Sequence, residues 1–213
     1  IAAVDSQPRA ARAAVRWTKS RHAVNRRRKI PVLFTRHGVK FGVVCGGSDR
    51  NGKVDEDLLL ITVTDAETGS VIAVLWNFAC HPVGHPHPQE VSAHFVGVVR
   101  EEIRASYNNP DLPILFFQGF SGDLRPRSKS TMWPETNGLR RLVQPVGYRA
   151  FSAEDYKSWT RSMAESVEAA LTSEPSPIRG QGARVVRQEM PRTSFVIGSG
   201  NNAPVSFAAL ELG

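Results

Sequence analysis

Histidines are concentrated in one short segment of the chain. Four of the six histidines lie between Cys80 and His94. Neutral imidazole is the commonest nitrogen ligand of zinc, so these side chains could converge on a metal ion if the loop curls. The spacing matches no closed zinc motif, and His-Pro pairs are also typical of loops, because proline forces its predecessor into an extended conformation. His81, at the end of a predicted strand, is therefore the main candidate for a metal ligand or catalytic residue. His85 and His87 favour surface exposure, and His94 leaves both interpretations open.

A second segment, residues 118–126, reads Gln-Gly-Phe-Ser-Gly-Asp-Leu-Arg-Pro. Gly119 and Gly122 follow an apolar run, where glycines let the backbone approach a ligand and offer N–H groups to an anion or oxyanion. Asp123 could order a metal-bound water or hold a histidine. Ser121 resembles a nucleophile-elbow serine, but that motif requires glycine at the position of Asp123. A Ser/His/Asp hydrolase that uses Ser121 is therefore an alternative rather than the leading hypothesis.

Both segments follow apolar runs that predict β-strands. Val71–Cys80 is almost continuously apolar, which is typical of a strand buried on both faces, and Ile114–Phe117 is a second such run. Between them, apolar residues recur at helical spacing from Ser92, a candidate N-cap, to an Asn-Asn-Pro stop. A strand, a helix and a strand in this order make the two strands parallel, so that their carboxyl ends meet at one edge. We expect His81 and the loop from Gln118 to be neighbours at this edge, where open α/β proteins bind ligands.

The rest of the chain predicts an α/β fold, a layered sandwich with a mixed, partly parallel β-sheet flanked by helices. Residues 31–57 predict loops with one short extended piece, and residues 121–150 predict an aperiodic loop. Within the first of these loops, Asp55-Glu56-Asp57 lacks the spacing of a calcium loop and favours a turn. The other predicted elements are an extended piece at Val39–Val44, strands at Leu58–Thr64, Ala183–Glu189 and Val205–Leu212, and a helix capped by Ser152.

The composition is that of a globular protein, with 41% hydrophobic and 22% charged residues among 213. The apolar runs are too short for a transmembrane helix, so we predict no transmembrane segment. The net charge of +7 is uneven, because residues 1–50 hold twelve Lys/Arg against two Asp/Glu. The basic run at residues 26–29 is either a solvated loop or an anion-binding element. It lacks interleaved aromatic residues and a recognised module, so we predict no nucleic-acid partner.

Several short motifs occur in a characteristic order along the chain. They are Asn25-Arg26-Arg27, Val54-Asp55, Asn77-Phe-Ala-Cys-His81-Pro82, Val91-Ser92-Ala93 and Gln118-Gly-Phe-Ser-Gly-Asp-Leu-Arg-Pro126. In this order and spacing they resemble the central part of the neutral/alkaline ceramidase superfamily, especially its bacterial ceramidase-like hydrolases. The resemblance implies an α/β catalytic domain in which histidines, a Glu and a Tyr hold one zinc ion, and in which an amide bond is hydrolysed.

The resemblance assigns roles to particular residues. His81 stands at a zinc histidine of the family, and Arg26 at the active-site arginine of its Asn-Arg motif. Arg125 stands where ceramidases have the serine of Gly-Asn-Leu-Ser-Pro, and His94 where the family usually has Asp. These departures predict a substrate other than ceramide, with an anionic group. The predicted site therefore comprises Arg26, Asp123 and Arg125 as catalytic residues, Asn25, Gly119 and Gly122 as substrate-binding residues, and His81 as a ligand of zinc.

The leading hypothesis is a zinc-dependent, ceramidase-like amidohydrolase that acts on an N-acyl or other amide substrate, either a small molecule or lipid-like. The alternative from another class is an inactive module of the same fold that binds an anionic glycan, lipid headgroup or phosphate through its arginines. We interpret residues 1–213 as one domain, a fragment of a larger catalytic domain, with the remaining zinc ligands outside it. The sequence leaves the oligomeric state and compartment undecided, and the resemblance is compatible with a secreted or periplasmic protein.

Overall fold

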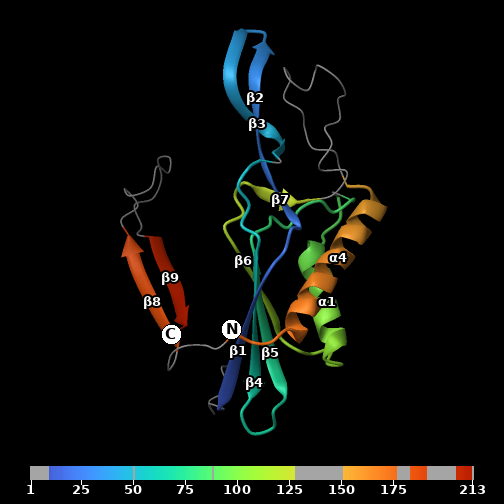
Figure 1. Cartoon of the computed structure of the whole chain (residues 1–213), viewed down its shortest axis with the longest axis vertical. Helices are drawn as coiled ribbons and strands as arrows, with labels where there is room; N and C mark the ends of the chain where they lie inside the picture. The colour runs from blue at the N-terminus through green and yellow to red at the C-terminus, as the bar shows by residue number, and fades with distance from the viewer. Residues whose placement is uncertain are drawn as a thin grey trace. The chain divides into compact units, whose positions relative to one another are not determined.

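The computed structural model describes residues 10–49, 51–87, 89–127, 151–176, 183–190 and 205–212. The chain divides into two compact units, Ile1–Ser176 and Pro177–Gly213. The first unit contains a four-stranded sheet, a three-stranded sheet and the helices α1 and α4, and the second contains a two-stranded sheet (Figure 1). The α/β fold with a mixed sheet is confirmed. The interpretation of the whole chain as one domain stays a prediction.

The four-stranded sheet is antiparallel on one side and parallel on the other. Its strands, in spatial order, are β1 (Ala11–Lys19), β4 (Asp57–Asp65), β5 (Val71–Phe78) and β6 (Ile114–Gln118). β4 pairs with β1 and β5 in antiparallel fashion, and β5 pairs with β6 in parallel. A tight turn joins β4 to β5, in which the Asp65 carboxylate accepts the N–H groups of Glu67 and Thr68, both at 2.9 Å.

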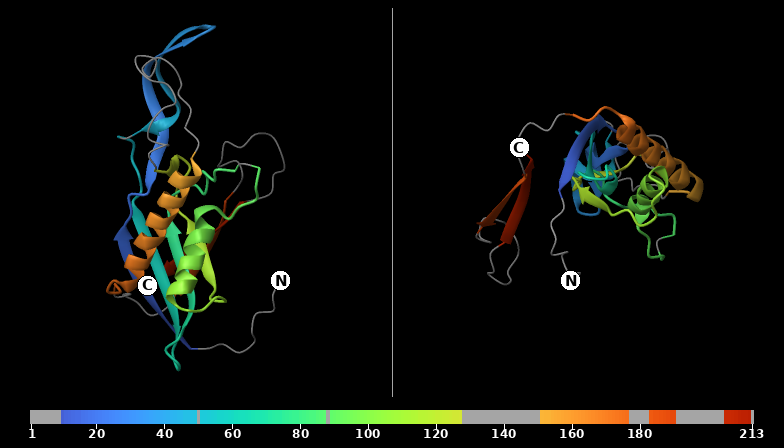
Figure 2. Two further views of the ribbon diagram at one scale, coloured as in Figure 1. Left: turned by 90° about the vertical axis from the view of Figure 1, so that its right-hand side faces the viewer. Right: turned by 90° about the horizontal axis from the view of Figure 1, so that it is seen from below.

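Two helices cover one face of this sheet (Figure 2). α1 (His94–Ser106) connects β5 to β6, so the predicted strand–helix–strand unit is confirmed. α4 (Ala153–Thr172) begins at Ser152, whose hydroxyl accepts the Asp155 N–H at 3.0 Å as expected of an N-cap. The prediction of Ser92 as the N-cap of α1 is wrong by one residue. The cap is Ala93, because Ser92 makes a tight turn in which its hydroxyl accepts the His94 N–H at 3.0 Å.

The main core lies between the sheet and the two helices. Alternate sheet residues point into it, including Leu58, Leu60, Val74, Trp76 and Phe78, all almost completely buried. The prediction that β5 and β6 are buried on both faces is wrong for the described chain. Alternate residues of β5 are only partly buried, and Leu115 and Phe117 on β6 are about half exposed, because both described helices lie on the other face. An unbroken apolar run therefore did not require two covered faces.

The three-stranded sheet has the order β3-β2-β7. Its strands are β2 (Ala23–Thr35), β3 (Gly38–Asp49) and β7 (Leu124–Pro126). Residues 26–29 lie in β2, so the interpretation of this basic run as a solvated loop is wrong. The extended piece predicted at Val39–Val44 is part of the longer strand β3, and β7 interrupts the loop predicted at residues 121–150. Glycines and charges masked the strand pattern of β3, and β7 is defined only by its pairing with β2. The other residues of that loop, 128–150, lie outside the described ranges.

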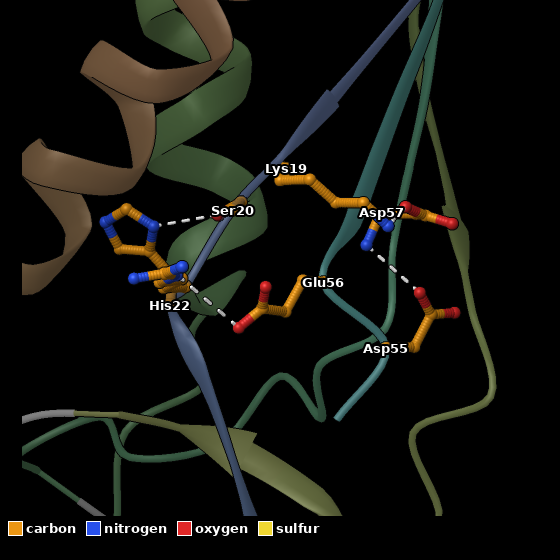
Figure 3. A network of polar contacts seen from close by, with 7 residues as sticks. Lys19, Ser20, His22, Asp55, Glu56 and Asp57 are labelled. Atoms are coloured by element: carbon orange, nitrogen blue, oxygen red, sulfur yellow. Dashed lines mark hydrogen bonds and ion pairs between the residues drawn. The ribbon is translucent and has the colours of Figure 1, made fainter. Parts of the chain in front are cut away.

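A polar network fixes the connection between β1 and β2 (Figure 3). Lys19 forms an ion pair with Asp57, and the Ser20 N–H donates to the Glu56 carbonyl at 2.7 Å. His22 contacts the Ser20 hydroxyl through Nδ1 at 2.8 Å and the Ser162 hydroxyl of α4 through Nε2 at 3.0 Å. Glu56 and Asp57 thus hold the connection between β1 and β2. His22 links the start of β2 to α4.

The second unit consists of β8 (Ala183–Met190) and β9 (Val205–Leu212), which pair in antiparallel fashion over their whole lengths. Both strands were predicted from the sequence, within one residue of their bounds. The described part of this unit is therefore a β-hairpin.

Candidate functional site

His81 lies just beyond the carboxyl end of β5, beside the segment that follows β6. Its Nδ1 atom is 3.4 Å from the Ser121 hydroxyl and 3.4 Å from the amide nitrogen of Gln118. The same Gln118 nitrogen donates to the Ser121 hydroxyl. Parallel pairing places Phe78 opposite Gln118, and the next residue, Gly119, donates its N–H to the Phe78 carbonyl at 3.2 Å. The predicted neighbourhood of His81 and the second loop is confirmed.

The cluster of His81, Ser121 and Gln118 supports two kinds of chemistry. If Nδ1 carries the imidazole proton, it donates to the Ser121 oxygen, and the lone pair of Nε2 is left to bind a metal ion. If Nε2 carries the proton, Nδ1 can accept the proton of the Ser121 hydroxyl and act as a base. The side chain of Ser121 is only 3% exposed, and a nucleophile must be reached by its substrate. The geometry therefore favours Ser121 as the residue that orients His81.

Arg26 holds the second loop in place from the neighbouring sheet. Its guanidinium donates through Nε and Nη2 to the Gly122 carbonyl, at 3.1 and 2.7 Å, and its backbone N–H donates to the Asp123 carbonyl at 2.7 Å. Arg26 is partly buried in β2. The sequence assigned this residue to an anionic substrate group, whereas these contacts give it a positioning role in the loop that carries Ser121.

Asn25 and Asp123 form a partly buried polar contact between β2 and the loop. The Asn25 amide donates to the Asp123 carboxylate at 2.9 Å and to the Lys53 carbonyl at 3.0 Å. The Asn25 side-chain oxygen accepts the Arg27 N–H at 2.8 Å. Most of the bonding capacity of Asn25 is thus used within the protein, and the carboxylate of Asp123 is bonded to an amide. The sequence had offered Asn25 for substrate binding and Asp123 for a histidine or a water.

The two glycines of the loop have different surroundings. A Cβ atom on Gly119 would lie 3.0 Å from the Ala79 Cβ and 3.1 Å from the Ala79 Cα, whereas one on Gly122 would meet nothing within 4 Å. Gly119 therefore permits the close approach of the chain after β6 to the chain after β5. Its N–H group is bonded to Phe78 rather than directed at a ligand. Gly122 contributes its carbonyl to Arg26.

Arg125 lies in β7, opposite Val24 of β2, and is buried. Its guanidinium is close enough to Cys80 to act on the thiol electrostatically. Burial raises the pKa of Cys80 far above its usual range, and the nearby charge of Arg125 offsets only part of that rise. Cys80 is buried in the core, and the raised pKa of its thiol does not favour a thiolate. Arg125, predicted as a catalytic residue that suits an anionic substrate, is thus a buried residue of β7.

The other histidines of the first segment gather against α4. The His85 ring lies 5.8 Å from that of His87, 6.1 Å from that of His94 and 5.4 Å from that of Tyr156, between ring centres. Burial and the neighbouring His85 lower the pKa of His94. Among the described residues, no three His, Cys, Asp or Glu side chains are placed to hold one metal ion. Zinc binding by His81 therefore stays a prediction.

The sequence did not identify Gln118 and Gly52 as site residues. Gln118 is the last residue of β6, and that position was the available signal. Gly52 lies so close to Asn25 that a Cβ atom on it would be 2.5 Å from the Asn25 Cβ. No local pattern indicates this contact.

Neither described helix is both long and apolar enough to cross a bilayer.

Comparison with known proteins gives one informative likeness. No family model and no curated protein matches the sequence. Among solved structures, the chain is similar to neutral ceramidase from Pseudomonas aeruginosa, with a TM-score of 0.51 and 13% sequence identity. The likeness covers 93% of this chain but only 28% of the ceramidase chain. Identity this low shows the fold alone, so the chain is similar in fold to part of a neutral ceramidase.

Proposed function

We propose that the chain carries part of the active site of a ceramidase-like amidohydrolase, with His81 at its centre. The observation that carries the proposal is the position of His81 at the carboxyl edge of the parallel pair, where its Nδ1 atom faces the Ser121 hydroxyl, which in turn accepts a hydrogen bond from Gln118. The likeness in fold to a neutral ceramidase supports the hydrolase class. We further propose an amide substrate, N-acyl or otherwise, other than ceramide, because Arg125 replaces the serine that the resemblance would require.

The environment of His81 fits a zinc ligand in one respect. Histidines that bind metal ions usually donate their other ring N–H to an oxygen, which fixes the tautomer, and the Ser121 oxygen can accept this bond. The other ligands would come from residues outside the described ranges, since the described residues contain no three-ligand group. Zinc, when bound, supplies Lewis-acid polarisation of the amide carbonyl.

The residues around His81 would then have supporting roles. Ser121, itself held by the Gln118 amide, would keep the imidazole in one orientation, so that no reorganisation is needed during the reaction. Arg26 and Asn25 would fix the loop through Gly122 and Asp123. Of the two arginines predicted to bind an anionic group, Arg26 is the more exposed, and we propose that it contacts this group in addition to holding the Gly122 carbonyl. We assign buried Arg125 to support of the loop.

The test is metal analysis and hydrolysis of a panel of N-acyl substrates by the full-length protein. We expect His81→Ala to lose zinc and hydrolysis together, while His87→Ala, at an exposed position of the same loop, should keep both. A wild-type zinc content in the His81→Ala protein would contradict the metal assignment. Substrate binding without turnover by the wild-type protein would instead favour the inactive binding module.

One observation favours a second candidate, a serine hydrolase. The Ser121 hydroxyl is 3.4 Å from the His81 ring nitrogen, a looser version of a nucleophile–base pair. This mechanism predicts covalent labelling of Ser121 by a serine-directed phosphonate and complete loss of activity in Ser121→Ala. If Ser121 only orients His81, the variant should keep measurable activity and should not be the labelled residue.

A further inference from the structure

The hairpin formed by β2 and β3 has one continuous apolar face near its tip. Directly paired residues of an antiparallel hairpin point to the same side, as do residues two positions apart on one strand. Val32 pairs with Phe41 and Phe34 pairs with Val39. These four apolar side chains therefore share one face. The opposite face carries Lys29, which pairs with Val44, and Lys40, which pairs with Leu33.

This apolar face is exposed. Phe34 is 61% exposed, Val39 48% and Phe41 77%. β2 and β3 continue beyond the ends of α1 and α4, so the helices do not cover the tip (Figures 1 and 2). Two phenylalanines and two valines together on an exposed hairpin form the kind of apolar patch that marks an interaction surface.

The same hairpin is strongly basic. Residues 26–48 contain six Lys/Arg and no Asp/Glu. Of these, Lys29 and Lys40 are exposed on the strands, and Arg36 is exposed in the turn beside His37. The tip thus combines an apolar face with positive charge in its turn and on its other face. This combination complements a surface in which anionic groups lie next to an apolar layer.

We propose that the β2–β3 hairpin binds the surface of an anionic lipid bilayer. Phe34, Val39 and Phe41 would enter the boundary between headgroups and acyl chains, while Lys29, Arg36 and Lys40 contact anionic headgroups. A second copy of the chain is a poorer partner, because two such hairpins would bring like charges together. A nucleic acid would satisfy the charges but leave the valines and much of the apolar face in water. The proposal does not depend on the proposed hydrolase function, since it concerns the opposite end of β2.

The experiment is sedimentation of the full chain with vesicles. Wild-type protein is mixed with vesicles of phosphatidylcholine containing 30% phosphatidylserine, about the composition of an anionic leaflet, or with vesicles of pure phosphatidylcholine. The apolar variant is Phe34→Ser/Phe41→Ser, and its control is Phe117→Ser, at a 52% exposed position of β6. The charge variant is Arg36→Glu/Lys40→Glu, and its control is Lys157→Glu/Arg161→Glu on the exposed side of α4.

We expect wild-type protein to bind the anionic vesicles and to be released as salt is raised. Each hairpin variant should bind at least about 30-fold more weakly, from lost apolar insertion or lost headgroup attraction, and each control within about threefold of wild type. Equal binding to neutral vesicles, unchanged binding by the hairpin variants, or an equal loss in the controls would overturn the proposal. Sedimentation without vesicles would overturn it in favour of self-association. The salt titration needs no variant, so it tests the proposal even if a variant misfolds.

Discussion

β2 begins in the candidate site and ends in the exposed hairpin, and its two ends are built in different ways. At the first end, Asn25 and Arg26 are bonded to a loop that is distant in sequence but packed beside them. At the other end, Phe34 lies on the exposed face of a two-stranded ribbon. One strand therefore combines a region that is held by polar hydrogen bonds to other segments with a region whose side chains contribute little to the core. Substitutions should separate the two, because changes at the site end should destabilise the fold and changes at the tip should not.

Among substitutions in the candidate site, the largest loss of stability is expected for Asn25→Ala. Asn25→Ala would leave the Asp123 carboxylate, the Lys53 carbonyl and the Arg27 N–H without their present partner. A buried polar group that loses its partner costs about 1–3 kcal/mol, and these three bonds are partly buried, so the low end of that range for each gives an expected loss of about 3 kcal/mol in the free energy of unfolding. Urea denaturation measures it. Asn51→Ala, at an exposed position two residues from Lys53, is the control and should change stability by less than about 0.5 kcal/mol. Similar effects for the two variants would mean that the buried bonds do not stabilise this end.

A smaller loss is expected at Gly119. The methyl group of Gly119→Ala would press on Ala79, including its backbone, and overpacking of this kind costs about 1–3 kcal/mol. Gly122→Ala is the matched variant, three residues away in the same loop with open space around the new methyl group. We expect it to cost less than about 0.5 kcal/mol. Equal unfolding free energies for the two variants would contradict the close approach of the segments after β5 and β6.

The stability of the site end of β2 should also depend on pH, through His22, which directly precedes the strand. Burial lowers the pKa of His22 from 6.5, so below that pH the folded protein binds fewer protons at this site than the unfolded chain. The contribution of His22 to stability is therefore present above pH 6.5 and is lost as the pH falls through its lowered pKa. His22→Gln should reduce the decline in stability between pH 7.5 and pH 5. Urea denaturation at several pH values measures the decline, and a decline as steep in the variant as in the wild type would contradict the assignment.

The smallest effect on stability is expected at the tip. Phe41→Ser removes a side chain that is mostly in water, so the unfolding free energy should change by less than about 0.5 kcal/mol. Ile30→Ala, on the same strand pair but almost completely buried, should cost about 2–5 kcal/mol. A large loss for Phe41→Ser in urea denaturation would show that the tip belongs to the folded core and would weaken its assignment as a binding surface.

The sequence predicted the parts of the fold that rest on periodicity and on chain connection. The apolar runs at Val71–Cys80 and Ile114–Phe117, the helical spacing between them and the rule that crossovers join parallel strands were enough to bring His81 next to Ser121. The length of β3 could not be predicted, because its glycines resemble loop residues. β7, at three residues, has no pattern of its own and exists through its pairing with β2.

The supporting contacts of the site could not be predicted from local sequence. Asn25 and Asp123 are separated by 98 positions, and nothing in either segment indicates that an amide and a carboxylate will meet there. The same holds for the bonds between Arg26 and Gly122, which depend on how the two sheets lie in the fold. Several polar groups that the sequence assigned to a substrate, such as Asn25 and Asp123, are therefore bonded to each other in the structure.

The central claim, that His81 is the metal-binding centre of a hydrolase site, is tested most directly by anomalous diffraction. Crystals of the full-length protein, grown with zinc, would be measured on both sides of the zinc absorption edge. We predict an anomalous peak at about 2.0–2.1 Å from Nε2 of His81, with Nδ1 facing Ser121. A zinc peak bound entirely by other residues, with His81 outside the coordination sphere, would contradict the claim.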